Sequence, residues 1–134
     1  MANSAIVRRE EQSVLMELAE ADLQTIRDVI GQQIAAFRKD DAIAAFAEAA
    51  PGIQQQFGTA ENFVRMVKQA YPSVYRPRSV VFESLHKVEG LPAQQVMLMD
   101  QDGQLVRATY LMQQQPAGDW KIAGCYLTPM GYDE

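Results

Sequence analysis

The sequence predicts an α+β fold in which N-terminal helices pack on a curved, mainly antiparallel four-stranded sheet. Apolar residues in the first half recur at three- and four-residue steps, which is typical of amphipathic helices. The second half holds four short apolar runs separated by turn signals. Loops this short connect only antiparallel neighbours, so the runs form a meander that the helices are expected to cover.

Length and composition favour a single soluble domain. The chain has 134 residues, of which 48% are hydrophobic and 22% charged. Its net charge of -5 disfavours nucleic acid as a partner, because phosphate recognition needs a basic face. We divide the chain into an N-terminal helical extension, residues 1–21, and one domain, residues 22–134.

Several classes of protein are excluded or disfavoured by simple counts. A single cysteine, Cys125, excludes an intramolecular disulfide, and a single histidine, His86, excludes the common zinc sites, so we expect no cofactor and no metal. No run reaches the roughly 20 apolar residues of a membrane helix, so no membrane partner is expected. The N-terminus lacks a signal-peptide pattern, which makes a cytoplasmic protein our expectation.

The N-terminal region is predicted to hold a helix of about 9–20 and a main helix of about 22–38. One continuous helix fits the same apolar pattern. Asp22 can cap the main helix, because its carboxylate can accept free amide protons of the next turn. Gly31 inside that helix costs about 1 kcal/mol relative to alanine, which predicts close packing against another backbone.

Three shorter helices are expected next, at about residues 42–50, 53–57 and 60–70. Asp40-Asp41 ends the main helix and caps the first of them. Pro51-Gly52 ends that helix, because proline disfavours helical geometry in the residue before it. Gly58 closes the second helix and Thr59 caps the third. Tyr71 to Arg78 is predicted to be an irregular segment that crosses to the sheet.

Strands are expected at about residues 80–88, 94–99, 105–113 and 120–127. The firmest turn signal is Asp102-Gly103, because glycine accepts the positive φ of tight hairpins. Simple alternation places His86 on the face of Phe82. In the last strand it puts these residues together on one face: Trp120, Ile122, Gly124 and Tyr126.

The faces of the sheet predict the assembly of the protein. Neither face is cleanly polar, because both faces of the third and fourth strands carry apolar residues. A sheet that is apolar on both sides usually carries helices on one face and something else on the other, often a second subunit. We therefore expect a homodimer formed through the sheet.

The order of elements and a set of short motifs support a family resemblance. The motifs are Phe37-Arg38-Lys39-Asp40-Asp41-Ala42, Ala45-Phe46, Phe57-Gly58, Tyr75-Arg76-Pro77 and Trp120-Lys121-Ile122-Ala123-Gly124-Cys125. Over about residues 22–128 the chain is similar to an uncharacterised bacterial family of unknown function. The element order resembles the nuclear transport factor two-like superfamily, which includes scytalone dehydratase, steroid delta-isomerase and polyketide cyclases.

This resemblance implies a cystatin- or nuclear-transport-factor-two-like cone. Enzymes of the superfamily place acid–base residues, typically Asp, His or Tyr, inside that cone. No residue set in this sequence matches one of their patterns, and fold analogy does not assign chemistry.

The candidate catalytic residue is His86. A histidine in a pocket can act as a general base, and a position beside Tyr110 or Tyr126 would help. The alternative is an ordinary strand residue, which we favour because spacing fixes no second group. Asp40-Asp41 is better explained as a helix cap than as an acid–base pair. Cys125 is better explained as a small buried residue than as a nucleophile.

The candidate ligand-binding residues begin with Arg76 and Arg78, which lie among Tyr71 and Tyr75. Guanidinium groups offer forked donors, so this cluster could clamp an anionic ligand at the mouth of a cone. The alternative is a segment held by tyrosine packing, with both arginines in water. Three aromatic residues of the sheet complete the predicted ligand-binding set: Tyr110, Trp120 and Tyr126.

Two classes of function remain open from the sequence. The first is a non-catalytic homodimeric module that binds a small apolar or weakly anionic molecule, or a partner protein. The second is an isomerase, dehydratase or cyclase in which His86 and a cone-facing tyrosine or aspartate share proton transfer. A third possibility concerns the helix of about 9–20, which could dock onto a partner or swap between subunits.

Overall fold

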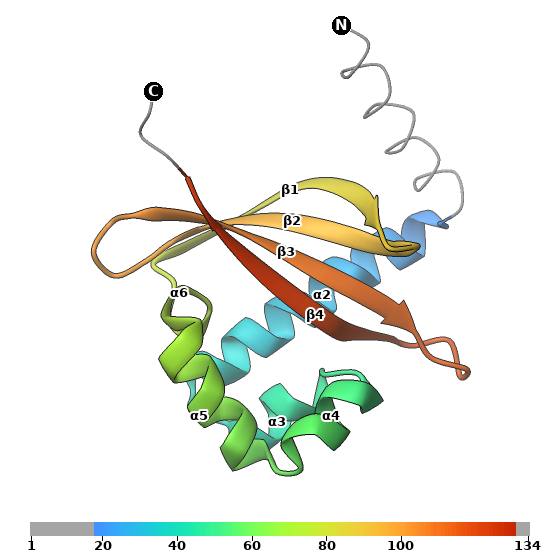
Figure 1. Cartoon of the computed structure of the whole chain (residues 1–134). Coiled ribbons are helices and arrows are strands. Elements are labelled where there is room, and N and C mark those ends of the chain that lie inside the picture. Colours follow the sequence, from blue (N-terminus) through green and yellow to red (C-terminus); the bar gives the residue numbers. More distant parts are fainter. Residues whose placement is uncertain (1–17, 131–134) are drawn as a thin grey trace, which may run out of the picture.

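The computed structural model describes residues 18–130, in which five helices precede a four-stranded sheet (Figure 1). The helices are α2 (Glu20–Arg38), α3 (Ala42–Ala47), α4 (Pro51–Phe57), α5 (Ala60–Ala70) and α6 (Pro72–Tyr75). The strands are β1 (Ser79–Val88), β2 (Leu91–Met99), β3 (Leu105–Gln114) and β4 (Trp120–Pro129). The predicted α+β class is confirmed. The predicted helix of about 9–20 falls almost entirely outside the described residues.

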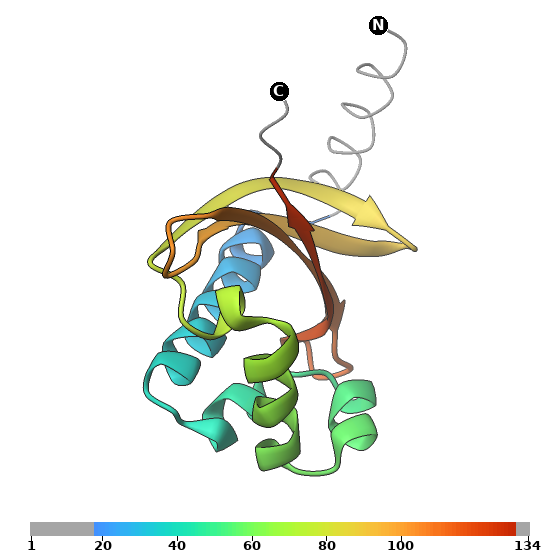
Figure 2. The ribbon, with the colours of Figure 1, turned by 60° about the vertical axis from the view of Figure 1, so that its left-hand side comes forward.

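The strands follow one another in the order β1-β2-β3-β4, and every neighbouring pair is antiparallel. The sheet curves, and the helices occupy its concave side (Figure 2). The largest fully buried side chains lie between these layers: Tyr110, Phe37, Ile26, Ile30, Leu98, Met112 and Val96. The predicted meander and its helical cover are therefore present.

Helix α2 lies against the sheet with its apolar stripe buried. Ile26, Ile30 and Ile34 recur at four-residue steps and are almost inaccessible to solvent. The helix begins two residues before the predicted start, and its N-cap is Ala19 rather than Asp22. Asp22 instead accepts a hydrogen bond from the Trp120 indole at 3.2 Å.

The predicted reason for Gly31 is wrong. Within residues 18–130, a Cβ built at this position in α2 would meet no atom within 4 Å, so no backbone of the described chain approaches it closely. Packing therefore does not explain a glycine here.

The short helices begin where capping residues allow. Asp41 accepts from the Ala44 amide, and Thr59 accepts from the Asn62 amide, both at 3.1 Å, which confirms both predicted caps. Helix α3 ends three residues early, because the chain then pairs with β4: the Ala50 amide donates to the Ile122 carbonyl at 2.8 Å. Pro51 begins α4, since the first residue of a helix needs no amide proton.

The segment predicted to be irregular contains one short helix, α6. This helix begins at Pro72 for the same reason as α4. The first hairpin is also tighter than predicted, because Glu89 and Gly90 both adopt positive φ, at 52° and 82°. Strand β2 therefore begins at Leu91, and Pro92 pairs with Lys87 inside the ladder.

A register shift in β1 changes which residues face the helices. Phe82 pairs with Val96, and Leu85 pairs with Gln94, so three steps along β1 match two along β2. His86 consequently lies on the opposite face from Phe82. The alternation predicted for this strand is wrong, because one inserted residue reverses every side chain after it.

A second shift, between β3 and β4, divides the face predicted for β4. Leu111 pairs with Gly124, whereas Met112 pairs with Ile122. Trp120 and Ile122 therefore face the helices. Past the inserted residue Ala123, Cys125 and Leu127 face the helices, and Gly124 and Tyr126 face away.

Candidate functional site

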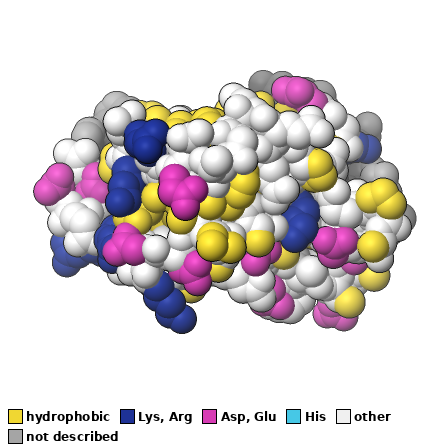
Figure 3. All heavy atoms as spheres, turned by 90° about the horizontal axis from the view of Figure 1, so that it is seen from below, with side chains coloured by type: hydrophobic (Ala, Val, Ile, Leu, Met, Phe, Trp, Pro, Cys, Tyr) yellow, Lys and Arg dark blue, Asp and Glu magenta, His cyan; other side chains and the backbone are white. Residues whose placement is uncertain are grey.

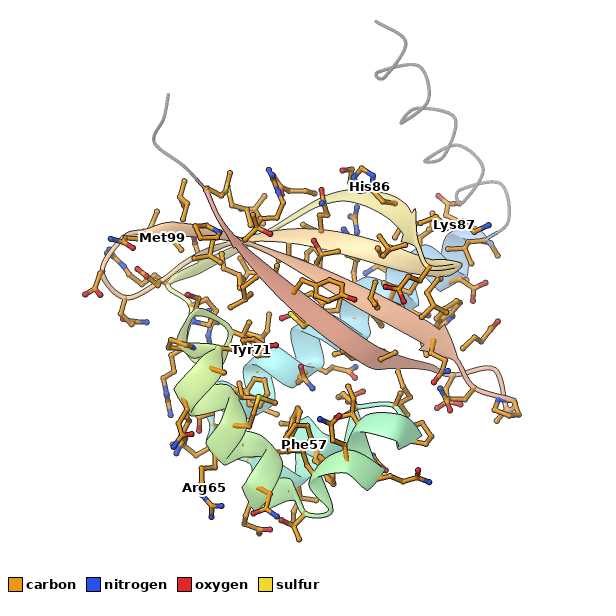
Figure 4. All side chains as sticks on the ribbon, viewed as in Figure 1. Phe57, Arg65, Tyr71, His86, Lys87 and Met99 are labelled. Atoms are coloured by element: carbon orange, nitrogen blue, oxygen red, sulfur yellow. The ribbon has the colours of Figure 1, made fainter. Side chains whose placement is uncertain are left out.

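A pocket of about 420 Å³ lies between the helical layer and strands β3 and β4. Apolar and aromatic side chains from four helices form one wall: Phe37, Ile53, Phe57, Phe63, Met66, Val67, Tyr71 and Val74. Residues of the two strands form the other: Tyr110, Ile122, Ala123, Gly124, Cys125 and Tyr126. Ala49, Gln33 and Gln56 complete the lining. Figure 4 shows Tyr71 close to the sheet and Phe57 among the helices on the same side.

The charged residues of the described chain lie outside this pocket. No Asp, Glu, Lys, Arg or His among residues 18–130 lines it. Figure 3, which looks at the helical side, shows charges of both signs on the surface, with apolar atoms exposed between them. The pocket is therefore an electrically neutral, largely apolar space.

Tyr110 is the polar residue that distinguishes this pocket from a gap in the core. It lies in the middle of β3 on the inner face, paired with Gln94 on one side and Cys125 on the other. The side chain is 1% exposed, yet its hydroxyl has no hydrogen-bond partner in the described part of the chain. Burial, and then the nearby Cys125 thiol, raise the pKa of Tyr110 well above 10.0, so the hydroxyl stays protonated.

Two other polar side chains in the pocket wall serve to join elements. The Tyr71 hydroxyl donates to the Cys125 carbonyl at 3.3 Å, which ties the end of α5 to β4. The Gln33 amide donates to the Ala45 carbonyl at 3.1 Å and joins α2 to α3. These bonds hold together the elements that form the pocket wall.

Phe63 supports the aromatic part of the wall. Its ring centroid lies 6.1 Å from that of Phe37, 5.4 Å from that of Phe46 and 5.8 Å from that of Phe57. The rings come from four different helices, because each helix directs its apolar stripe toward the sheet. Tilted and edge-on rings of this kind pack well against a flat or cyclic apolar molecule.

Cys125 faces the pocket from β4, as its pairing with Tyr110 requires. It is half-buried, and it makes no disulfide. Burial raises the pKa of its thiol from 9.0 to about 12, so the nucleophilic thiolate is strongly disfavoured. The arrangement suits a small apolar lining residue.

The predicted clamp residues Tyr75 and Arg76 lie outside the pocket and bind Asp40. The Tyr75 hydroxyl donates to one Asp40 oxygen, and the Arg76 guanidinium contacts the other at 2.7 Å. These two hydrogen bonds lower the pKa of Asp40. Arg76 also donates to the Arg38 carbonyl at 2.8 Å, so the cluster joins the end of α2 to the end of α6.

The remaining predicted residues are spread over the fold. Arg78 is exposed before β1, where its backbone amide donates to Met99. Trp120 is buried at the other end of β4, against Asp22. Tyr126 borders the pocket from the β4 edge, but its side chain is on the outer face and 49% exposed. Of the predicted ligand-binding set, the pocket thus brings together Tyr71, Tyr110 and Tyr126.

His86 lies on the outer face of the sheet, away from the pocket. Figure 4 shows it on the side opposite the helices, and its Nε2 lies 2.8 Å from the Ser84 hydroxyl. The register explains this placement: His86 pairs with Ala93, whereas Tyr110 pairs with the next residue, Gln94. Neighbouring strand residues face opposite sides, so His86 and Tyr110 cannot share a proton in one site.

Sequence reasoning missed most of the pocket wall. Phe37, Phe57 and Phe63 carry an ordinary helical pattern, which does not separate a pocket lining from a filled core. Among residues 18–130, no group of three His, Cys, Asp or Glu side chains could hold a metal ion. Within the same range, no helix combines the length and the apolar character that a membrane crossing needs.

The fold and the pocket define a class of protein: an α+β domain whose helices and curved antiparallel sheet enclose a small apolar cavity. Residues 19–132 match the family described as a domain of unknown function, DUF4864, and the chain belongs to that family. The expected membership of an uncharacterised family is thereby confirmed. A search of curated proteins and a search of solved structures each gave no match.

Proposed function

We propose that this protein is a non-catalytic module that holds a small apolar molecule in the pocket beneath β4. The observation that carries the proposal is Tyr110, a residue of the cavity wall whose buried hydroxyl has no partner in the described chain. Leaving such a group unpaired costs about 1–3 kcal/mol. A bound molecule that accepts its proton would remove that cost.

The dimensions and composition of the pocket support the same function. Small-molecule sites usually enclose roughly 300–1,000 Å³ and combine apolar walls with a few polar groups. The volume of about 420 Å³ lies within this range. The resemblance to cone-shaped nuclear-transport-factor-two-like proteins agrees with an internal pocket, by analogy of fold alone. The alternative, an enzyme with a His/Tyr acid–base pair, lacks support because His86 lies on the other face.

Binding is tested with an uncharged, environment-sensitive naphthyl ketone dye and by native mass spectrometry. We expect one dye per chain, or a copurified adduct that is lost on denaturation. Cys125→Phe fills the cavity and should weaken dye binding at least about tenfold. Thr128→Phe adds the same ring at an exposed position of the same strand and should bind normally. Absence of binding, or equal binding by both variants, contradicts the proposal.

We further propose that the protein forms a homodimer through the outer face of the sheet. Three large apolar side chains are exposed there: Val81 at 46%, Leu105 at 37% and Tyr126 at 49%. Arg107 on this face binds Glu83 at 2.8 Å. A face with an acid and a base side by side is electrostatically self-complementary, which suits a two-fold contact with a second copy.

The dimer predicts a specific response to charge. Val81→Lys combined with Leu105→Lys places two cations in the contact and should weaken self-association about 100-fold or more, measured by light scattering across a dilution series. Ile43→Lys is the matched control, because Ile43 is 75% exposed on α3, away from the sheet. If the wild-type protein is monomeric at high concentration, the proposed homodimer is contradicted.

A further inference from the structure

We infer that the pocket selects uncharged molecules that present a hydrogen-bond acceptor, such as a carbonyl oxygen, to the Tyr110 hydroxyl. This inference rests on the proposed binding function and names the class of ligand. Two independent features of the pocket carry it. One is the absence of charge from its described walls, and the other is the buried Tyr110 hydroxyl, which has no partner in the described chain.

The neutral walls discriminate against ionised ligands. A carboxylate or ammonium group that leaves water needs an opposite charge or several hydrogen bonds, and without them its burial is strongly unfavourable. Arg76, which was predicted to clamp an anionic ligand, instead binds Asp40 at 2.7 Å outside the pocket. The weakly anionic ligand considered from the sequence therefore fits this pocket poorly.

The hydrogen-bonding state of the wall decides what the neutral ligand must offer. Tyr71 gives its proton to the Cys125 carbonyl, and Gln33 gives an amide proton to Ala45. Tyr110 keeps its proton, because burial raises its pKa, and that proton has no acceptor in the described chain. A buried donor without a partner is rarer in proteins than a buried acceptor that makes fewer hydrogen bonds than it could. The ligand is therefore needed mainly to accept the proton of the Tyr110 hydroxyl.

The other residues of the pocket wall indicate what the body of the ligand should be. Cys125 and Ile122 from β4 and the rings of Phe37 and Phe63 offer only apolar surface to the body of the molecule. A flat or cyclic hydrocarbon frame with one acceptor oxygen matches these apolar surfaces and the Tyr110 hydroxyl, and Gln56 is a further polar residue of the lining. An ester, a ketone or an amide oxygen would serve equally for the contact with Tyr110.

The test uses three naphthalenes of nearly equal size: acetylnaphthalene, isopropylnaphthalene and naphthoate. They present, in turn, a neutral acceptor, no acceptor and a carboxylate. Competition with the neutral dye should show that wild-type protein binds the ketone about tenfold more tightly than the hydrocarbon. The carboxylate should bind at least about 100-fold more weakly than the ketone.

Tyr110→Phe should abolish the preference for the ketone while leaving hydrocarbon binding unchanged. The variant is expected to fold, because it removes a buried hydroxyl that has no partner. Thr109→Val removes a hydroxyl from the neighbouring position of β3, which faces away from the pocket, and should keep the preference. A preference that survives in Tyr110→Phe, or tight naphthoate binding to wild type, overturns this inference while the binding function stands. If the dye and all three naphthalenes fail to bind wild type, both proposals fail.

Discussion

Phe37→Ala is expected to lower the free energy of unfolding by about 3–5 kcal/mol. Phe37 is 1% exposed near the end of α2, and its ring lies 5.3 Å from Tyr75 and 6.1 Å from Phe63. It therefore connects the pocket wall to the Tyr75–Asp40 cluster. Because Phe37 also lines the pocket, its removal enlarges an existing cavity, which the neighbouring helices cannot easily close.

Chemical denaturation measures this loss, with Phe82→Ala as the matched control. Phe82 is half-buried on the inner face of β1, where Arg27 covers its ring at 5.7 Å, so its truncation should cost clearly less. A further expectation follows from the enlarged cavity. Benzene should raise the melting temperature of Phe37→Ala more than that of wild type, because an apolar cavity stays dry and accepts an apolar guest. Equal losses in the two variants would show that the pocket wall is not a stabilising core.

Most of the fold follows from local signals in the sequence. Asp41 and Thr59 cap helices because each can accept an amide proton three residues later, and this chemistry is readable from residue types. The strands follow from short apolar runs and glycine turns in the same way. These features depend on neighbours in the chain, so the order of elements was predictable.

The faces of the sheet were not predictable, because bulges depend on tertiary curvature. One extra residue in β1 moved His86 to the outer face, and one in β4 did the same to Tyr126. Nothing in the local composition marks either position. As a result, His86 lies outside the pocket, and Tyr126 only borders it.

The candidate site was predicted in part, for a related reason. Tyr71 and Tyr110 line the pocket, as the sequence led us to expect. Arg76 does not, because Asp40, 36 residues earlier, takes its guanidinium. Asp40 adopts a positive φ of 55°, a conformation that aspartate tolerates better than most residues. A partner that distant in the chain leaves no signal in a single sequence.

Cys125 in the folded protein is expected to react with a neutral alkylating reagent more than about tenfold more slowly than in the unfolded chain. Burial raises the pKa of the thiol from 9.0 to about 12, which lowers the thiolate fraction at about pH 8, and the greater nucleophilicity of a more basic thiolate offsets only part of that loss. The direction in which the labelling rate changes with pH follows from the same pKa. The rate should rise about tenfold per pH unit while the protein stays folded, because the thiolate fraction does so below the pKa.

Mass spectrometry of timed samples measures the rate, with the reaction in concentrated guanidinium chloride as the unfolded reference. The matched control is Thr128→Cys in a Cys125→Ala background, which moves the thiol to an exposed position of the same strand and should restore fast labelling. A ligand in the pocket should slow the labelling of Cys125 further, because Cys125 lies in its wall beside Tyr110. Labelling of native Cys125 within about tenfold of the unfolded rate would mean that β4 leaves the helices often, and a pocket closed by that strand could not hold a small molecule for long.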